Sequence, residues 1–179
     1  PLPGGEIENF AAFEAEARRV LPPEIEQSSL HGLLRNHGTE YRAVLREHGN
    51  STVTNVPDTR TLTAEIRYAV NHEMAVHLDD VVMRRTDLAA GSHPGRAALL
   101  ATAAEMGRQL AWSAERLHRE LAAVERNLRR HLAHDPNADV ASSDEPDNRT
   151  ARALDDVAMP TSVPTDGAML AESNVRASA

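Results

Sequence analysis

The sequence predicts an all-α protein, a small orthogonal bundle of about five or six helices followed by a disordered acidic C-terminal tail. Aromatic residues make up only 3% of the 179 residues, and the apolar content is mostly Ala, Leu and Val. This mixture suits packed helices better than β-strands. Apolar residues recur every three or four positions up to about Leu132, and this period is absent from residues 134–179. We therefore expect a helical domain over residues 1–133 and an acidic, largely disordered tail over residues 134–179.

Three short helices are expected in the first fifty residues. The first begins near Glu6 and ends where Pro22-Pro23 stops it. The second covers about residues 24–36 and ends at His37-Gly38, because Gly readily adopts the left-handed conformation that terminates helices. The third begins at Thr39 and ends at His48-Gly49, and a loop follows over residues 50–60.

The strongest helical pattern runs from Thr63 to about Thr86 and predicts one long central helix. Its apolar stripe includes Ile66, Val70, Met74 and Leu78, which repeat every four residues. These side chains are expected to be the most buried of the domain.

Another helical pattern follows Gly91-Ser92-His93-Pro94 and extends to about Leu132. An unbroken helix of nearly forty residues is unusual in a globular domain, and Ser113 is a good N-cap residue. We therefore expect two helices with a break near Ser113, although the pattern alone also permits one.

The composition excludes several kinds of functional site. Cysteine is absent, which excludes disulfides, thiolate metal sites and a Cys nucleophile within this chain. All 19 basic residues are Arg against 27 acidic ones, a net charge of −8. A GC-rich genome or a high-salt cytoplasm would each explain the missing lysine, and the acidic balance argues against a nucleic-acid or anionic-membrane surface. The chain begins with Pro1 and has no signal segment or bilayer-spanning apolar run, so we expect an excised cytoplasmic piece.

Three motifs suggest chemistry and are better explained structurally. His72 and His77 resemble a zinc-protease helix, but they are five residues apart instead of four and would point in different directions on a helix. His131 and His134 have loose ligand spacing at the start of the tail. Asp79 and Asp80 diverge by about 100° on a helix, and Asp80 has Arg84 within reach, which favours a structural ion pair over acid–base catalysis.

No glycine arrangement matches a phosphate-binding loop, so nucleotide binding by this chain alone is not expected. With the three motifs above interpreted as structural, we expect no cofactor, metal or catalytic residue in this chain.

Three segments carry a resemblance to a known family. They are Leu2-Pro3-Gly4-Gly5, Leu33-Leu34-Arg35-Asn36-His37-Gly38-Thr39, and the block from Glu65 to Thr86 that contains Leu78-Asp79-Asp80-Val81-Val82-Met83-Arg84-Arg85. Residues 1–130 resemble the C-terminal domain of FAD-dependent glycerol-3-phosphate dehydrogenases. Leu110-Ala111-Trp112-Ser113 is similar to the helix junction of that family, with Ala111 where the family often has Gly.

The resemblance implies a partner and a non-catalytic role. In this family the N-terminal body binds FAD, oxidises glycerol 3-phosphate to dihydroxyacetone phosphate, and passes electrons to a quinone or similar acceptor. The helical domain packs on that body as a cap. The resemblance therefore implies structural or interdomain roles for Asp80, Arg84 and Arg85. It implies that FAD is bound only in the intact enzyme and that any membrane contact is made only through the intact enzyme. The intact enzyme would then be cytoplasmic or peripheral on the cytoplasmic membrane. It is compatible with an oligomer. The alternative is a free-standing helical protein-interaction module.

Overall fold

The computed structural model describes residues 5–21, 23–49 and 52–132. Over these ranges the chain is helical and contains no strand beyond one isolated bridge between Asn55 and Leu62. The all-α prediction is confirmed. The chain divides after residue 146, and every described residue belongs to the first unit, residues 1–146. The predicted tail over residues 134–179 lies outside the described residues.

The first three helices lie close to their predicted places. They are α1 (Phe10–Val20), α2 (Gln27–His37) and α3 (Tyr41–Arg46), with a 3-10 turn, η1 (Gly38–Glu40), between the last two. The Asn9 side chain caps α1 by accepting a hydrogen bond from the backbone N–H of Ala12. Gly38 ends α2 as predicted, but with φ 52° and ψ −131°, a positive-φ conformation that Gly tolerates and that differs from the left-handed helical conformation expected from the sequence.

The predicted central helix is wrong as a single element. Its pattern divides into α4 (Thr63–His72), a non-helical connection, the short α5 (Leu78–Asp80) and a π-helical turn, η2 (Val81–Arg85). Ile66 and Leu78 are fully buried as expected, but Val70 is only half-buried and Met74 is 84% exposed. The period of four therefore continues through a segment that is not a helix.

The last pattern forms two helices, α6 (Arg96–Leu110) and α7 (Ala114–Leu132). Ser113 caps α7, because its hydroxyl accepts a hydrogen bond from the backbone N–H of Arg116 at 3.2 Å. Ala111 makes the turn in the left-handed conformation, with φ 50° and ψ 47°. The expected break is therefore present.

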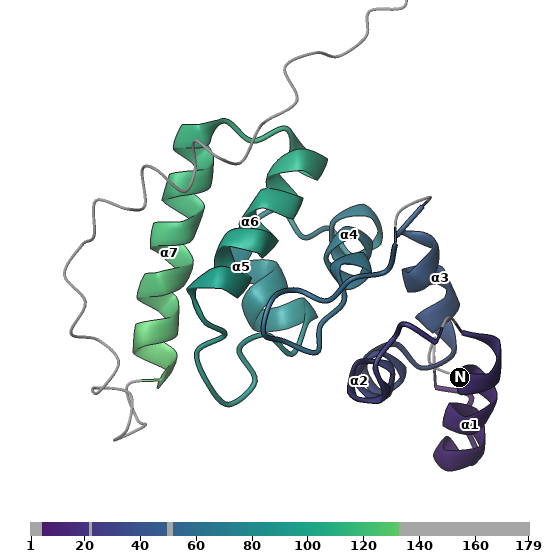
Figure 1. Ribbon diagram of the computed structural model, residues 1–179. Coiled ribbons are helices and arrows are strands. Elements are labelled where there is room, and N and C mark those ends of the chain that lie inside the picture. The colour runs from purple at the N-terminus through teal and green to yellow at the C-terminus, as the bar shows by residue number, and fades with distance from the viewer. Residues whose placement is uncertain (1–4, 22, 50–51, 133–179) are drawn as a thin grey trace, which may run out of the picture. The chain divides into compact units, whose positions relative to one another are not determined.

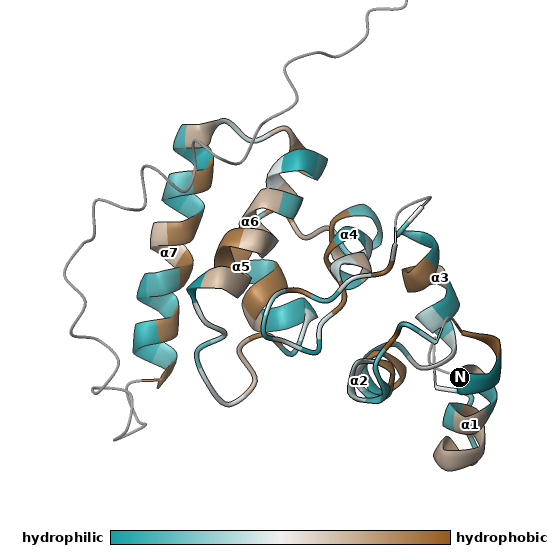
Figure 2. Cartoon of the chain, in the orientation of Figure 1, coloured by the Kyte–Doolittle hydropathy of each residue, from teal (hydrophilic) through white to brown (hydrophobic). Residues whose placement is uncertain are grey.

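The helices pack against one another in pairs through buried apolar side chains. Helix α4 contacts α3 and α6, and α7 contacts α5 and α6, so that α6 lies between α4 and α7 (Figure 1). Figure 2 shows hydrophobic and hydrophilic residues alternating along α7, which buries Leu117, Val124 and Leu128. The largest fully buried side chains include Trp112, Tyr41 and Met106.

Candidate functional site: the segment from Glu73 to Arg85

The connection between α4 and α5, residues 73–77, is the most unusual part of the described backbone, and we call it the 73–77 loop. Helix α4 ends at His72, and Met74 follows with a positive φ of 57°. Residues other than Gly, Asn and Asp seldom adopt this conformation. The backbone N–H of Ala75 returns to the carbonyl of Ala69 at 3.0 Å, which fixes the exit of the chain from the helix.

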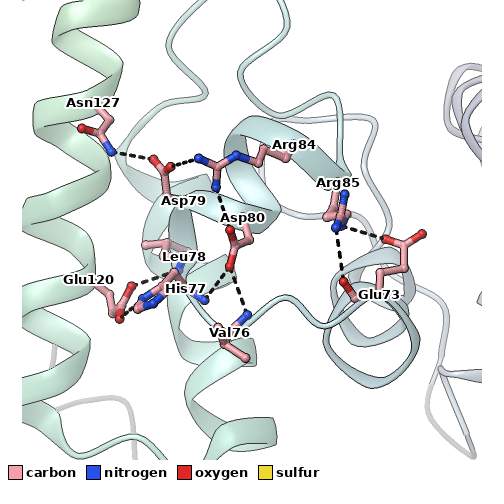
Figure 3. Close-up of polar contacts among 10 residues, drawn as sticks. All are labelled: Glu73, Val76, His77, Leu78, Asp79, Asp80, Arg84, Arg85, Glu120 and Asn127. Carbon is pink, nitrogen blue, oxygen red and sulfur yellow. Dashed lines mark hydrogen bonds and ion pairs between the residues drawn. The ribbon is translucent and has the colours of Figure 1, made fainter.

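Asp80 holds the far end of the loop. Its carboxylate accepts hydrogen bonds from the backbone N–H groups of Val76 at 3.2 Å and His77 at 3.0 Å, and from the Arg84 guanidinium at 2.7 Å (Figure 3). Burial alone would raise the pKa of Asp80, but the two backbone donors and Arg84 outweigh it and lower the pKa below its ordinary value. Asp80 therefore stays ionised, and as the third residue of α5 it accepts a hydrogen bond from the backbone N–H of the N-cap residue, His77.

Helix α7 supplies a second set of contacts to the same segment. Glu120 accepts hydrogen bonds from the backbone N–H of Leu78 at 3.1 Å and lies 3.0 Å from His77 Nδ1. Asn127 donates to Asp79 at 2.9 Å, and Arg84 also approaches Asp79 at 3.5 Å (Figure 3). The first turn of α5 is thereby tied to a helix about forty residues later in the chain.

Two arginines contact the carbonyl groups of the loop. Arg85 donates to the backbone carbonyl of Glu73 at 3.4 Å, and its Nε lies 3.8 Å from the Glu73 carboxylate (Figure 3). Arg116 donates to the carbonyl of Val76 at 3.0 Å while its guanidinium covers the ring of the buried Trp112. Asp80, Arg84 and Arg85, the residues that the sequence singled out, thus converge on one connection.

The loop is held by several hydrogen bonds, yet it exposes apolar side chains. Met74 is 84% exposed and Val76 47%, whereas Ala75 between them is 1% exposed and Leu78 is fully buried. Met74 and Val76 therefore point out of the domain, whereas Ala75 between them points into it.

The two histidines of the predicted pseudo-motif pair separately with glutamates. His72 Nε2 lies 2.8 Å from Glu47 on the α3 side, and His77 pairs with Glu120 on α7. Hydrogen bonds from Asn71 and His72 lower the pKa of Glu47 below its ordinary value. In the described ranges no group of three or more His, Asp or Glu side chains is arranged to hold a metal ion. His131 is exposed near the end of α7, and His134 lies outside the described residues.

Sequence reasoning missed two buried contacts between polar side chains. His37 on α2 lies 3.2 Å from Glu65 on α4, with side-chain exposures of 7% and 3%. Arg67 donates to the buried Glu105 at 2.6 Å, and Arg108 pairs with the other oxygen of the same carboxylate. The burial of Glu105 would raise its pKa, but the two arginines outweigh it and lower the pKa. Both contacts join different helices and are part of the packing between them.

Comparison with known protein families shows which family the chain belongs to. Residues 1–117 match the family described as the C-terminal domain of alpha-glycerophosphate oxidase. The chain belongs to this family. The match includes the whole of the 73–77 loop and ends within α7, so the structure gives a helical arrangement for this alpha-glycerophosphate oxidase C-terminal domain.

Two further comparisons found nothing: no curated protein and no solved structure matches the chain significantly. Within the described part of this alpha-glycerophosphate oxidase C-terminal domain, no helix is long and apolar enough to cross a membrane.

Proposed function

We propose that the chain is the C-terminal helical domain of an FAD-dependent glycerol-3-phosphate dehydrogenase. The intact enzyme oxidises glycerol 3-phosphate to dihydroxyacetone phosphate and passes the electrons to a quinone or similar acceptor. The chain packs against the flavin-binding body and takes no part in the chemistry. The observation that carries the proposal is the family match over residues 1–117. We assign the helical domain to residues 1–133, the acidic tail to residues 134–179, and the intact enzyme to the cytoplasm or the cytoplasmic face of the membrane.

The contacts of Asp80, Arg84 and Arg85 support a role in positioning the 73–77 loop. Asp80 is ionised and already accepts from two backbone N–H groups and Arg84, so it has neither a proton to donate nor a free geometry for general-base work. Arg84 is engaged by Asp79 and Asp80, and Arg85 by Glu73. These residues shape one connection within the domain, which suits a surface that receives another domain.

The proposal is tested by comparing this 179-residue chain with the complete polypeptide that its gene encodes. The complete polypeptide is expected to show the visible absorbance of a bound flavin and to oxidise glycerol 3-phosphate with an artificial electron acceptor. The chain alone is expected to do neither. Flavin absorbance or glycerol 3-phosphate oxidation by the chain alone would contradict the non-catalytic role. A gene that encodes no flavin-binding body with this domain would favour the free-standing interaction module.

A further inference from the structure

We propose that the 73–77 loop is the docking surface of this domain, with Met74 and Val76 seated in an apolar recess of the flavin-binding body of the same polypeptide. This inference rests on the proposed function, because it takes the flavin-binding body as the partner. It adds the residues that make the contact and the kind of surface that must meet them.

The first observation is where exposed apolar side chains occur. Among the described residues, only three large hydrophobic side chains are markedly exposed: Val20, Met74 and Val76. Two of the three lie in this one loop, and Met74 is the most exposed at 84%. Single exposed apolar side chains are ordinary on protein surfaces, but a pair presented together on a short connection indicates a contact site.

The second observation is that the backbone is strained at the most exposed of these residues. Among the described residues, three non-glycine residues have a positive φ: Met74 at 57°, Asp58 and Ala111. Asp tolerates this conformation, and Ala111 lies in the turn between α6 and α7. Backbone strain of this kind persists only where the surroundings enforce it, and it is concentrated at functional sites. Gly would adopt the same turn without strain, so the Met side chain is the feature that needs an explanation.

The third observation is that hydrogen bonds from within the domain hold the loop. Asp80 accepts from the N–H groups of Val76 and His77, Arg116 donates to the carbonyl of Val76, and Arg85 donates to the carbonyl of Glu73. A surface that is already fixed loses little conformational entropy on binding. Met74 and Val76 are therefore presented in a defined geometry.

The chemistry of the rim defines the partner surface. His72 is 51% exposed and His77 is 61% exposed, and each is paired with a glutamate of its own domain. An apolar centre with a polar rim is the usual anatomy of a protein–protein contact. Because these rim side chains already have hydrogen-bonding partners within the domain, the partner is expected to offer an apolar recess rather than a strongly charged patch.

The size of the patch points to a tethered partner. Two apolar side chains are too few to hold an independent protein, since stable complexes bury about 1,200–2,000 Å². A covalently linked domain is present at an effective concentration of about millimolar, so a smaller contact suffices. The loop also lies within the residues that match an oxidase C-terminal domain, a domain that is by its description linked to the rest of an oxidase.

The experiment measures domain contact in the complete polypeptide by the rate at which a protease cleaves between the flavin-binding body and this domain. Met74→Ala is expected to raise that rate about tenfold or more, the effect of losing one buried Met side chain on an equilibrium. Met74→Gly should do the same while relieving the backbone strain, so that a folding defect cannot produce the result. Val20→Ala, which shortens the exposed apolar side chain of Val20 on α1, outside the loop, is the matched control and should leave the rate unchanged.

The outcomes separate this inference from the proposed function. If the complete polypeptide binds flavin but both Met74 variants are cleaved at the wild-type rate, the loop is not the docking surface and the proposed function stands. If Val20→Ala has the same effect as the Met74 variants, the contact is not specific to the loop, and the inference is overturned. If the polypeptide contains no flavin-binding body, the inference and the proposed function both fail.

Discussion

Replacing Ala111 by Gly should stabilise the domain. Ala111 stands between α6 and α7 with φ 50°, and both its own N–H and that of Trp112 bond to the carbonyl of Gly107. This is the arrangement that favours Gly as the left-handed residue after a helix. The left-handed conformation costs an L-residue roughly 1–2 kcal/mol, and Gly loses about 0.4–1 kcal/mol more entropy than Ala on folding. The strain is the larger of the two, so Ala111→Gly should raise the free energy of unfolding by roughly 0.5–1 kcal/mol.

The matched control is Ala104→Gly in the interior of α6, where the backbone is ordinary helix. There Gly relieves no strain and should lower the free energy of unfolding by roughly 0.5–1 kcal/mol. Urea denaturation followed by circular dichroism would measure both variants, and thermal melts should move in opposite directions by a few degrees. If Ala111→Gly destabilises the domain as much as Ala104→Gly does, Ala111 is not left-handed in solution and our account of the turn is wrong.

Two further predictions concern buried groups. Leu78→Asp should lower the free energy of unfolding by several kcal/mol, out of a typical total of about 5–15 kcal/mol, because Leu78 is fully buried. Val70→Asp should lower it clearly less, because Val70 is half-buried. Equal decreases of the melting temperature in the two variants would contradict this burial pattern. The pKa of Glu105 is lowered from an ordinary 4.5, so its contribution to stability is present above that pH and is lost as the pH falls through the folded-state value. Glu105→Gln should therefore lower the free energy of unfolding by about 1–3 kcal/mol at neutral pH, because Arg67 and Arg108 lose their charged partner. The variant should also lose less stability than the wild type as the pH falls. If urea titrations show the same dependence of stability on pH in both proteins, this role of Glu105 is refuted.

The fold class and the break after α6 could be predicted because their signals are local. Ala-rich and Leu-rich periodicity predicts helices, and Ser113 is a side chain that caps a helix wherever the chain can turn. The position of the turn was predicted, but the backbone conformation that makes it was not. The sequence indicated a junction at Ala111, and the structure adds that an Ala there adopts the left-handed conformation.

The interruption of the central helix was missed because periodicity cannot distinguish an exposed Met from a buried one. Met74 lies at the position where a helix would bury it, four residues after Val70 and four before Leu78. A usable signal was nevertheless present. Asp79 and Asp80 are typical of the first turn of a helix, where carboxylates meet free backbone N–H groups, and Asp80 accepts a hydrogen bond from the backbone N–H of His77, the N-cap residue of α5, in this way.

The two buried polar contacts could not be predicted from the sequence for a different reason. His37 and Glu65 are 28 residues apart, and Arg67 and Glu105 are 38 apart. Their pairing depends on how α2, α4 and α6 pack, which no local pattern specifies. Residues such as Asp80 and Arg84, four apart on one turn, are predictable partners because a helix alone brings them together.

The most direct test of the central claim is amide hydrogen exchange of the 73–77 loop in two samples, the 179-residue chain and the complete polypeptide. If the loop is where this domain meets the flavin-binding body, the amides of Met74 to His77 exchange more slowly in the complete polypeptide, while those around Val20 on α1 exchange equally in both. Equal exchange of the 73–77 amides in the two samples would contradict the claim.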